Sequence, residues 1–120
     1  MFVEPTLIKQ IWPKIWPLIE DIVVLETQDE LLADLVAGNR IMIIIGDGVS
    51  IVRDCGGFLE INYVAGKNIK KWKDQMDSAI LAVAKSFGCD KIAALGKRGW
   101  KKIWPDYEMT NQVLFIRRVV

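Results

Sequence analysis

The sequence predicts an α/β (α+β) fold in which helices pack on a mixed β-sheet, with the element order α-α-β-β-β-α-β-α-β. Two observations support this prediction. Residues 58–95 have the pattern of a strand, a long helix and a second strand, and such a crossover makes the two strands parallel neighbours. Two short apolar, β-branched runs precede the crossover, and with its first strand, to which glycine turns connect them, they predict an antiparallel meander.

The first predicted element is a helical region interrupted by prolines. Apolar residues recur at spacings of three and four before Glu26, which is typical of an amphipathic helix. Pro13 and Pro17 each remove an amide donor and crowd the preceding turn. We therefore expect a short segment as far as Trp12 and then a separate helix that runs to about Leu25.

A second helix and the meander follow. Thr27 with Glu30 forms a capping box, and Gly38 with Asn39 is a helix stop. These signals predict a helix over 28–37 and strands over 40–45, 49–53 and 58–64.

The second half of the chain begins with the long helix. Its apolar residues are three and four apart from Ile69 to Phe87, and Gly88 ends it. We then expect a buried strand over 91–95, a short helix over 99–107 and a final strand over 112–119.

Composition limits the class of protein. With 120 residues the chain is expected to form a single domain over 1–120, and 52% hydrophobic residues exclude a disordered chain. The formal net charge of +1 argues against a general nucleic-acid binder. No apolar run reaches the roughly 18 residues that cross a bilayer, and no secretion signal opens the chain, so we expect a soluble intracellular protein.

The titratable residues narrow the chemistry. The chain has no histidine, which excludes histidine-based triads and imidazole metal ligands, and no metal site is predicted. Cys55 and Cys89 are too few for a disulfide framework or a zinc site. We expect both to be free, buried thiols.

Lysines crowd the start of the long helix, where acidic residues are normally preferred. This pattern predicts a phosphate site, unless the side chains are simply solvated and offset by Asp74 and Asp77. A second basic cluster follows the next strand, and the alternative for it is a basic, solvated helix face. If the two clusters flank one crevice, a diphosphate cofactor, an acidic protein partner or a nucleic-acid backbone would suit it. The two clusters are Lys67, Lys70, Lys71 and Lys73, and Lys97, Arg98, Lys101 and Lys102.

Glu60 is the candidate catalytic residue, because it is the only acid in the pattern of a central strand. Strict alternation places Phe58, Glu60, Asn62 and Val64 on one face and Leu59, Ile61 and Tyr63 on the other. A carboxylate beside the crevice can act as a general base. The alternative is an outward-facing surface residue, and Tyr107 and Cys89 are weaker candidates.

Three Ile-Trp-Pro triplets occur at 11–13, 15–17 and 103–105. Their tryptophans, Trp12, Trp16 and Trp104, either fill core and edge positions or form an aromatic patch for a protein partner or a second copy of the chain.

The order of elements resembles that of the GNAT N-acetyltransferase superfamily over nearly the whole chain. Two short motifs, Gly88-Cys89 and the segment 96–100 (Gly-Lys-Arg-Gly-Trp), resemble small GNAT-like proteins of tailed bacteriophages. The resemblance implies a GNAT-like mixed sheet and location in the host cytoplasm or the virion.

The resemblance also implies an acetyl-coenzyme A site between the third meander strand and the strand after the long helix. Pantetheine would lie along Asn62, Tyr63 and Val64, and Glu60 would act as the base. The pyrophosphate would meet the turn that contains Gly66, Lys67, Lys70 and Lys71.

Two departures from the family pattern leave other functions open. The turn has Asn68 and Ile69 where a second glycine is usual, and Ile103 and Trp104 stand where a general-acid tyrosine is common. The acyltransferase activity is therefore either retained or vestigial. The alternatives are a non-catalytic virion-associated or partner-binding protein, or an inhibitor of a host nucleic-acid-handling complex.

Overall fold

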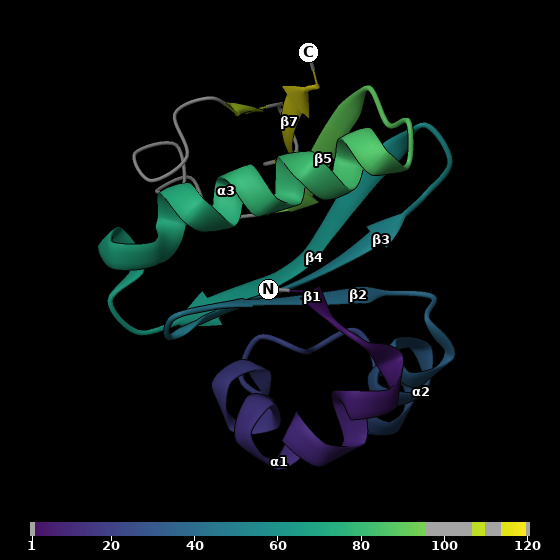
Figure 1. The fold of residues 1–120 in the computed structure, drawn as a ribbon, viewed down its shortest axis with the longest axis vertical. Helices are drawn as coiled ribbons and strands as arrows, with labels where there is room; N and C mark the ends of the chain where they lie inside the picture. The colour runs from purple at the N-terminus through teal and green to yellow at the C-terminus, as the bar shows by residue number, and fades with distance from the viewer. Residues whose placement is uncertain (1, 96–106, 110–113, 120) are drawn as a thin grey trace.

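The computed structural model of the chain describes residues 2–95, 107–109 and 114–119. Within these residues a central sheet separates two helical layers (Figure 1). The helix α3 (Ile69–Ser86) covers one face, and α1 (Ile8–Ile19) and α2 (Gln28–Ala37) cover the other. A 3-10 turn over Pro5–Leu7 precedes α1.

The described residues form a seven-stranded sheet with the order β1-β2-β3-β4-β5-β7-β6. Strands β4 and β5 are parallel, and the other neighbouring pairs are antiparallel. The mixed α+β class and the parallel crossover are thereby confirmed. The strands are β1 (Phe2–Val3), β2 (Ile41–Ile45), β3 (Gly48–Asp54), β4 (Phe58–Gly66), β5 (Lys91–Leu95), β6 (Glu108–Met109) and β7 (Leu114–Arg118).

Most element boundaries agree with the sequence signals. Helix α2 starts and stops where the capping box and the helix stop placed it, and Thr27 and Glu30 make both hydrogen bonds of the box. Strand β5 also has its predicted limits. The two-residue strands β1 and β6 were not predicted, because segments this short show no periodicity. The predicted helix over 99–107 lies outside the described residues except for Tyr107.

The prediction that prolines break the first helix is wrong. Helix α1 runs from Ile8 to Ile19 with Pro13 and Pro17 inside it. Both prolines are exposed, so water can reach the carbonyl groups that lose a hydrogen bond. The opposite side of α1 is buried, and each buried large side chain stabilises by roughly 1.5–3 kcal/mol against about 3 kcal/mol for an interior proline. The four buried side chains belong to Ile8, Trp12, Ile15 and Ile19.

A β-bulge in β4 overturns the predicted alternation. Ile51 pairs with Tyr63, but the next residue of β3, Val52, pairs with Ile61, so Asn62 is the extra residue. Ile61 packs in the core beneath α3, whereas Tyr63 packs against the core beneath α1 and α2. Tyr63 therefore does not share a face with Leu59 and Ile61, because one extra residue exchanges the two faces of the strand.

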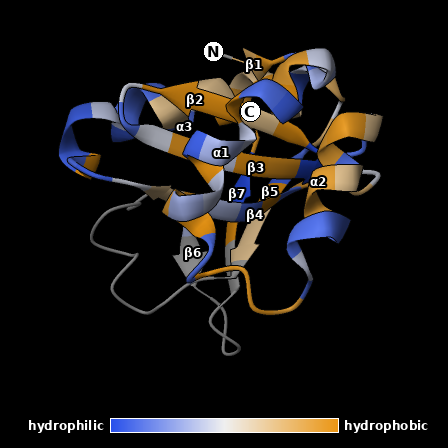
Figure 2. Ribbon diagram, turned by 90° about the horizontal axis from the view of Figure 1, so that it is seen from below, coloured by the Kyte–Doolittle hydropathy of each residue, from blue (hydrophilic) through white to orange (hydrophobic). Residues whose placement is uncertain are grey.

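Two hydrophobic cores hold the layers together, and the hydrophobic strands β2 and β3 lie between them (Figure 2). The core on the α3 side includes Ile43, Val52, Leu59, Ile61, Trp72, Met76, Ile80 and Ile92. The core on the α1 and α2 side includes Ile8, Trp12, Ile15, Ile19, Leu31, Leu35, Met42 and Ile51. No helix in the described part of the chain has the length and apolar character needed to cross a membrane.

Candidate functional site

Strands β4 and β5 separate after a short paired stretch. Their described pairing runs from Phe58 with Lys91 to Ile61 with Ala94, whereas β4 continues to Gly66. The bulged residue Asn62 is the first residue beyond the last described pair. On the β5 side, the backbone groups of β4 from Asn62 onward thus have no strand partner among the described residues. Such an edge can hydrogen-bond an extended ligand.

The open edge of β4 ends at the start of α3, which lacks a side-chain cap. Asn68, the N-cap residue, makes no capping hydrogen bond and has φ 58° and ψ 46°. The Trp72 indole donates to the Lys67 carbonyl over 2.7 Å and fixes the turn. The Lys71 amide donates to the Asn68 carbonyl over 2.9 Å, whereas the Ile69 and Lys70 amides have no side-chain cap, as at an anion site.

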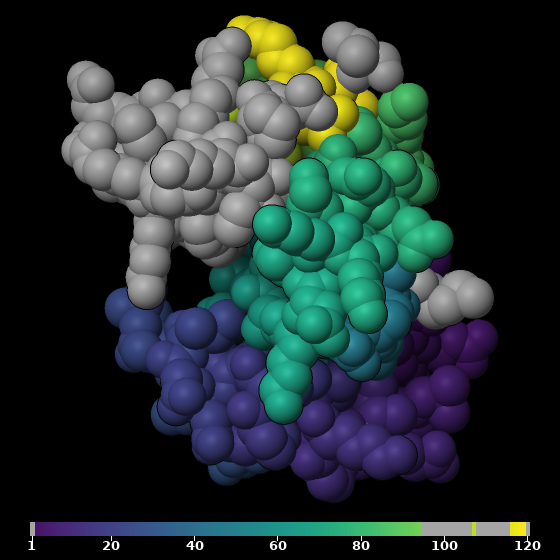
Figure 3. Space-filling view, turned by 90° about the vertical axis from the view of Figure 1, so that its left-hand side faces the viewer, coloured from purple at the N-terminus to yellow at the C-terminus, as the bar shows by residue number. Residues whose placement is uncertain are grey.

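Three of the four predicted lysines surround this helix start. Lys67, Lys70 and Lys71 are exposed, and none forms an ion pair with another described residue. Asp74 pairs instead with Lys73 at 3.5 Å, and Asp77 pairs with Arg117. The three lysines are solvated, as the alternative expected, but neither aspartate forms an ion pair with them, and only Lys73 of the described cluster pairs with Asp74. Figure 3 faces this end of α3, where long side chains project from the teal surface.

The turn between β4 and α3 forms without a second glycine. Gly66 has φ 134°, and a Cβ there would lie 2.2 Å from the Asp47 carbonyl oxygen, so glycine is required for packing against the neighbouring hairpin. Asn68 occupies the left-handed conformation that glycine would otherwise supply, and asparagine tolerates it better than most residues. The missing glycine therefore does not prevent the turn. With the open edge and the uncapped amides, these residues fit an extended ligand that ends in a diphosphate.

A pocket of about 660 Å³ lies on the α1 and α2 side of the same strand segment. The loop after α1, strand β3, strand β4 and strand β5 all contribute to its walls. Its polar lining consists of Glu26, Arg40, Arg53, Glu60, Asn62 and Tyr63. Its apolar lining consists of Ile22, Val24, Leu25, Phe58, Ile61, Ala93 and Ala94.

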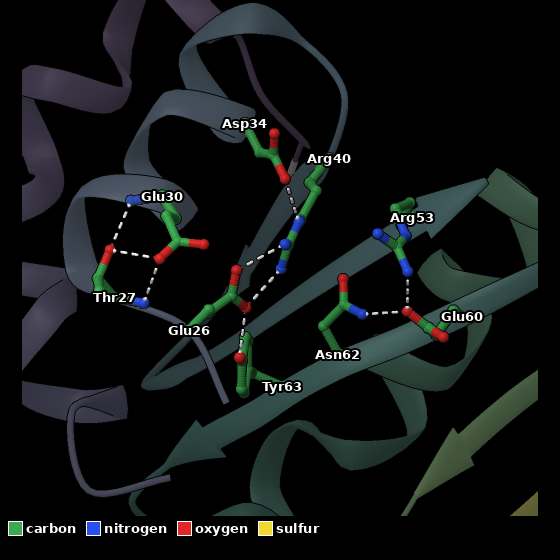
Figure 4. A network of polar contacts seen from close by, with 9 residues as sticks. All are labelled: Glu26, Thr27, Glu30, Asp34, Arg40, Arg53, Glu60, Asn62 and Tyr63. Atoms are coloured by element: carbon green, nitrogen blue, oxygen red, sulfur yellow. Dashed lines mark hydrogen bonds and ion pairs between the residues drawn. The ribbon is translucent and has the colours of Figure 1, made fainter. Parts of the chain in front are cut away.

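Glu26 is the centre of the first polar group in the pocket (Figure 4). Its carboxylate accepts two hydrogen bonds from Arg40, at 2.6 and 2.8 Å, and one from the Tyr63 hydroxyl at 2.5 Å. Arg40 also donates to Asp34 over 3.0 Å. Burial raises the pKa of Glu26, but the hydrogen bonds from Arg40 and Tyr63 and the charge of Arg40 outweigh it and hold the pKa below its usual value. Burial and the hydrogen bond to Glu26 raise the pKa of Tyr63 to about 12.

Arg53, Glu60 and Asn62 form the second polar group, which is separate from the first in Figure 4. The Glu60 carboxylate accepts hydrogen bonds from Arg53 at 2.9 Å and from the Asn62 amide at 2.5 Å. The Glu60 side chain is 34% exposed. The candidate base therefore lines the pocket, directly before the strands separate.

The structure brings together most of the predicted site. Glu60, Asn62 and Tyr63 line the pocket, and Gly66, Lys67, Lys70 and Lys71 lie at the far end of the open β4 edge. The Val64 side chain packs against the core beneath α3, which leaves its backbone for a ligand. The second basic cluster, 97–102, lies outside the described residues.

The weaker candidates have structural roles. Tyr107 is buried in the core with its ring under Arg117. Cys55 and Cys89 are free thiols, as expected, although Cys55 is only half-buried. Burial and the neighbouring Asp54 raise the pKa of Cys89. Cys89 is therefore not an activated nucleophile.

The structure describes two of the three tryptophans of the Ile-Trp-Pro triplets. Trp12 is buried, and Trp16 packs beside it at a centroid distance of 5.7 Å. Trp104 lies outside the described residues. Trp12 is thus a core residue, and a patch that binds a partner stays a prediction.

Sequence reasoning missed Glu26, Arg40 and Arg53. Arg53 lies directly opposite Glu60 in the β3–β4 pair, so the opposite charges would have been a signal once the hairpin register was known. Glu26 and Arg40 are single charges in the loops before α2 and before β2. Their pairing depends on how the layers meet, and the sequence carries no sign of it.

Comparisons with known proteins identify similar folds. No protein-family model matches the chain, and the search of curated proteins gave no significant match. Solved structures do match. One is N-acetylglutamate synthase from Neisseria gonorrhoeae in complex with coenzyme A and N-acetyl-glutamate, with a TM-score of 0.71 and 14% identity. The match covers 100% of this chain but 35% of that one, so the chain spans about a third of that enzyme.

Two further matches cover most of both chains. A GNAT-family acetyltransferase from Staphylococcus aureus Mu50 has a TM-score of 0.61 and 9% identity over 100% of this chain and 99% of that one. A putative GNAT-family acetyltransferase from Bacteroides thetaiotaomicron has a TM-score of 0.57 and 13% identity over 97% and 84%. At these identities the matches define the fold alone. The chain has the mixed α+β fold of GNAT-family acetyltransferases.

Proposed function

We propose that the chain is an acyl-coenzyme A-dependent N-acyltransferase that uses acetyl-coenzyme A. The observation that carries the proposal is the open edge of β4, which begins at the bulged Asn62 and ends at the uncapped, lysine-rich start of α3. This edge and the pocket lie at the same strand segment. An extended donor along the edge and an amine in the pocket would therefore meet beside Glu60.

Acetyl-coenzyme A would supply an acetyl group activated as a thioester. The amides of Ile69 and Lys70 at the start of α3, with the side chains of Lys67, Lys70 and Lys71, would bind the pyrophosphate. The backbone of residues 62–64 would pair with the pantetheine arm, and an amide near Tyr63 or Val64 would donate to the thioester carbonyl. Glu60 would take a proton from the acceptor ammonium, directly or through water.

Calorimetric titration with acetyl-coenzyme A tests the binding step. We expect saturable binding, and the absence of binding at millimolar ligand would contradict the proposal. Turnover is tested by release of the coenzyme A thiol with amine acceptors.

Replacing the proposed base should separate chemistry from binding. For Glu60→Gln we expect a fall in kcat of about 10²- to 10⁴-fold with unchanged acetyl-coenzyme A affinity. The control is Glu20→Gln, because Glu20 is exposed at the end of α1, outside the pocket. If both variants keep full activity, Glu60 is not the base.

A second candidate function is partner binding without catalysis. The observation that favours it is the exposure of Val24 and Leu25, which are 77% and 89% accessible. The resemblance to bacteriophage proteins, with a location in the host cytoplasm or the virion, supports this second candidate function. Light scattering over a range of concentrations tests self-association, and a strict monomer would contradict a homo-oligomer.

A further inference from the structure

Two buried polar atoms of residues that line the pocket have no partner among the described residues. Arg53 Nε, a donor, and Asn62 Oδ1, an acceptor, are buried and form no hydrogen bond. A buried polar atom without a partner costs roughly 1–3 kcal/mol. Both residues line one pocket, and a ligand reaches these two atoms where its binding turns the Arg53 and Asn62 side chains toward it.

Arg53 is the guanidinium of the pocket that is available to an anion. Arg40 is already engaged by Glu26 and Asp34, with a side chain that is 9% exposed. Arg53 is 43% exposed and has one described ion pair, which uses a single nitrogen to reach Glu60. A guanidinium of this kind binds a carboxylate through two parallel hydrogen bonds.

Acceptors for an ammonium group lie beside Arg53. The Asn62 amide nitrogen binds Glu60, so its oxygen is directed to the other side, towards the space between the two polar groups in Figure 4. The Glu60 carboxylate and the Asn62 oxygen together can accept hydrogen bonds from an N–H₃⁺ group. The pocket therefore presents a cation and an anion with an unpaired acceptor, which complements a zwitterion.

The mouth of the pocket is apolar. Ile22, Val24 and Leu25 come from the loop after α1, and Phe58 comes from the start of β4. All four side chains are exposed, by 44%, 77%, 89% and 37% in that order. An apolar group on the ligand would cover part of this surface at roughly 25 cal/mol per Å².

We propose that the acyl acceptor is a free α-amino acid with an apolar side chain. Its carboxylate binds Arg53, its ammonium group contacts the Glu60 carboxylate and the Asn62 amide oxygen, and its side chain contacts Val24 and Leu25. The inference rests on the proposed acyl transfer, because it names the acceptor of that reaction.

The transfer step balances with these groups. Glu60 takes one proton from the ammonium, and the amine nitrogen then attacks the thioester carbonyl carbon. A C–N bond forms, the C–S bond breaks, and the sulfur leaves with the electron pair. The nitrogen loses its second proton, which the thiolate takes up, so the products are an N-acyl amino acid and a thiol.

Three probes that share one side chain test the carboxylate. Calorimetric titrations with L-leucine, L-leucinamide and 3-methylbutylamine are made with and without saturating coenzyme A. We expect L-leucine to bind at least tenfold more tightly than either analogue, because a charge-assisted contact to Arg53 contributes about that factor. Equal affinities, or no L-leucine binding in either condition, would overturn the inference.

The two conditions separate this inference from the proposed function. If coenzyme A binds and L-leucine does not, the acceptor class is wrong and the donor site stands. If L-leucine binds with the expected preference and coenzyme A does not, the acceptor site stands and the acyl transfer is wrong.

Variants of Arg53 test whether this residue binds the carboxylate of the amino acid. Arg53→Gln should abolish the preference for L-leucine over L-leucinamide, and Arg53→Lys should retain part of it. Arg118→Gln is the matched control, because Arg118 is exposed and does not line the pocket. A preference that survives in folded Arg53→Gln protein would overturn the assignment. The wild-type comparison decides the question if that variant does not fold.

L-serine tests the apolar mouth. It keeps the amino-acid head group but offers a small polar side chain, so we expect weaker binding than for L-leucine. Equal binding of the two amino acids would contradict the role given to Val24 and Leu25.

Discussion

Glu26 connects three segments that are distant in the sequence. It lies in the loop after α1 and holds both Arg40, which precedes β2, and Tyr63 of β4. Its side chain is 14% exposed and that of Arg40 is 9%, so the pair is mostly removed from water. Glu26 thus fixes the loop that carries Val24 and Leu25 over the pocket.

Glu26→Gln should lower the free energy of unfolding by roughly 2–3 kcal/mol at neutral pH, because Arg40 would keep a buried charge with weaker partners. The pKa of Glu26 is lowered in the folded state, so its contribution is present above the unfolded pKa and is lost as pH falls through the folded pKa. Urea unfolding of the wild type and of Glu26→Gln at a series of pH values measures the difference in their free energy of unfolding. The difference should shrink in acid, whereas a constant difference would contradict the assignment; Glu20→Gln is the exposed control.

Tyr63 provides a second test of the same network. The chain has two tyrosines, so tyrosinate absorbance during an alkaline titration can be assigned by comparing wild type with Tyr63→Phe. We expect the absorbance change that is lost in Tyr63→Phe to titrate with a pKa of about 12. Because the folded pKa is raised, the stabilisation is complete below the ordinary value of about 10 and is lost as pH rises through about 12. If this absorbance change titrates near 10, the hydrogen bond to Glu26 is absent in solution.

At the scale of elements, the start of α3 is the proposed pyrophosphate site. The helix begins without a side-chain cap, and Trp72 and Gly66 hold its turn against the hairpin between β2 and β3. A Cβ at Gly48 would meet the Trp72 ring at 2.4 Å, so the glycine of that hairpin is also required. Packing against the hairpin therefore fixes the turn, and the exposed lysines lie at this fixed turn.

The double variant Lys70→Glu, Lys71→Glu should weaken acetyl-coenzyme A binding roughly tenfold or more, because two favourable charges at the proposed pyrophosphate site become unfavourable. Calorimetric titration measures the change. Lys85→Glu is the matched control, because Lys85 is an exposed lysine in the last turn of the same helix. An equal effect of the control, or no effect of the double variant, would show that the phosphates bind elsewhere.

At the scale of the whole molecule, local signals in the sequence predict the fold well. The capping box of α2, the three-and-four spacing of α3 and the apolar run of β5 act within single elements, and the structure confirms each of them. Their order was enough to imply the GNAT-like architecture.

Features that depend on contacts between elements were not predictable. Helix α1 continues through two prolines because its buried face packs on the sheet. The bulge at Asn62 follows from the pairing of β3 with β4, so simple alternation placed Tyr63 on the wrong face. Glu26 and Tyr63 are 37 residues apart, and no local pattern links them. Glu60 was predicted as the base from the sequence, and this role stays a prediction, whereas the pocket around it was not predicted.

The central claim is that acyl-coenzyme A lies along β4 beyond the bulge. Amide chemical-shift mapping by NMR during a titration with acetyl-coenzyme A tests it most directly. We predict that the largest shifts occur from Asn62 to Lys71, with little change in the exposed amides of α2. Saturable shifts confined to other parts of the chain, or no shifts at millimolar ligand, would contradict the claim.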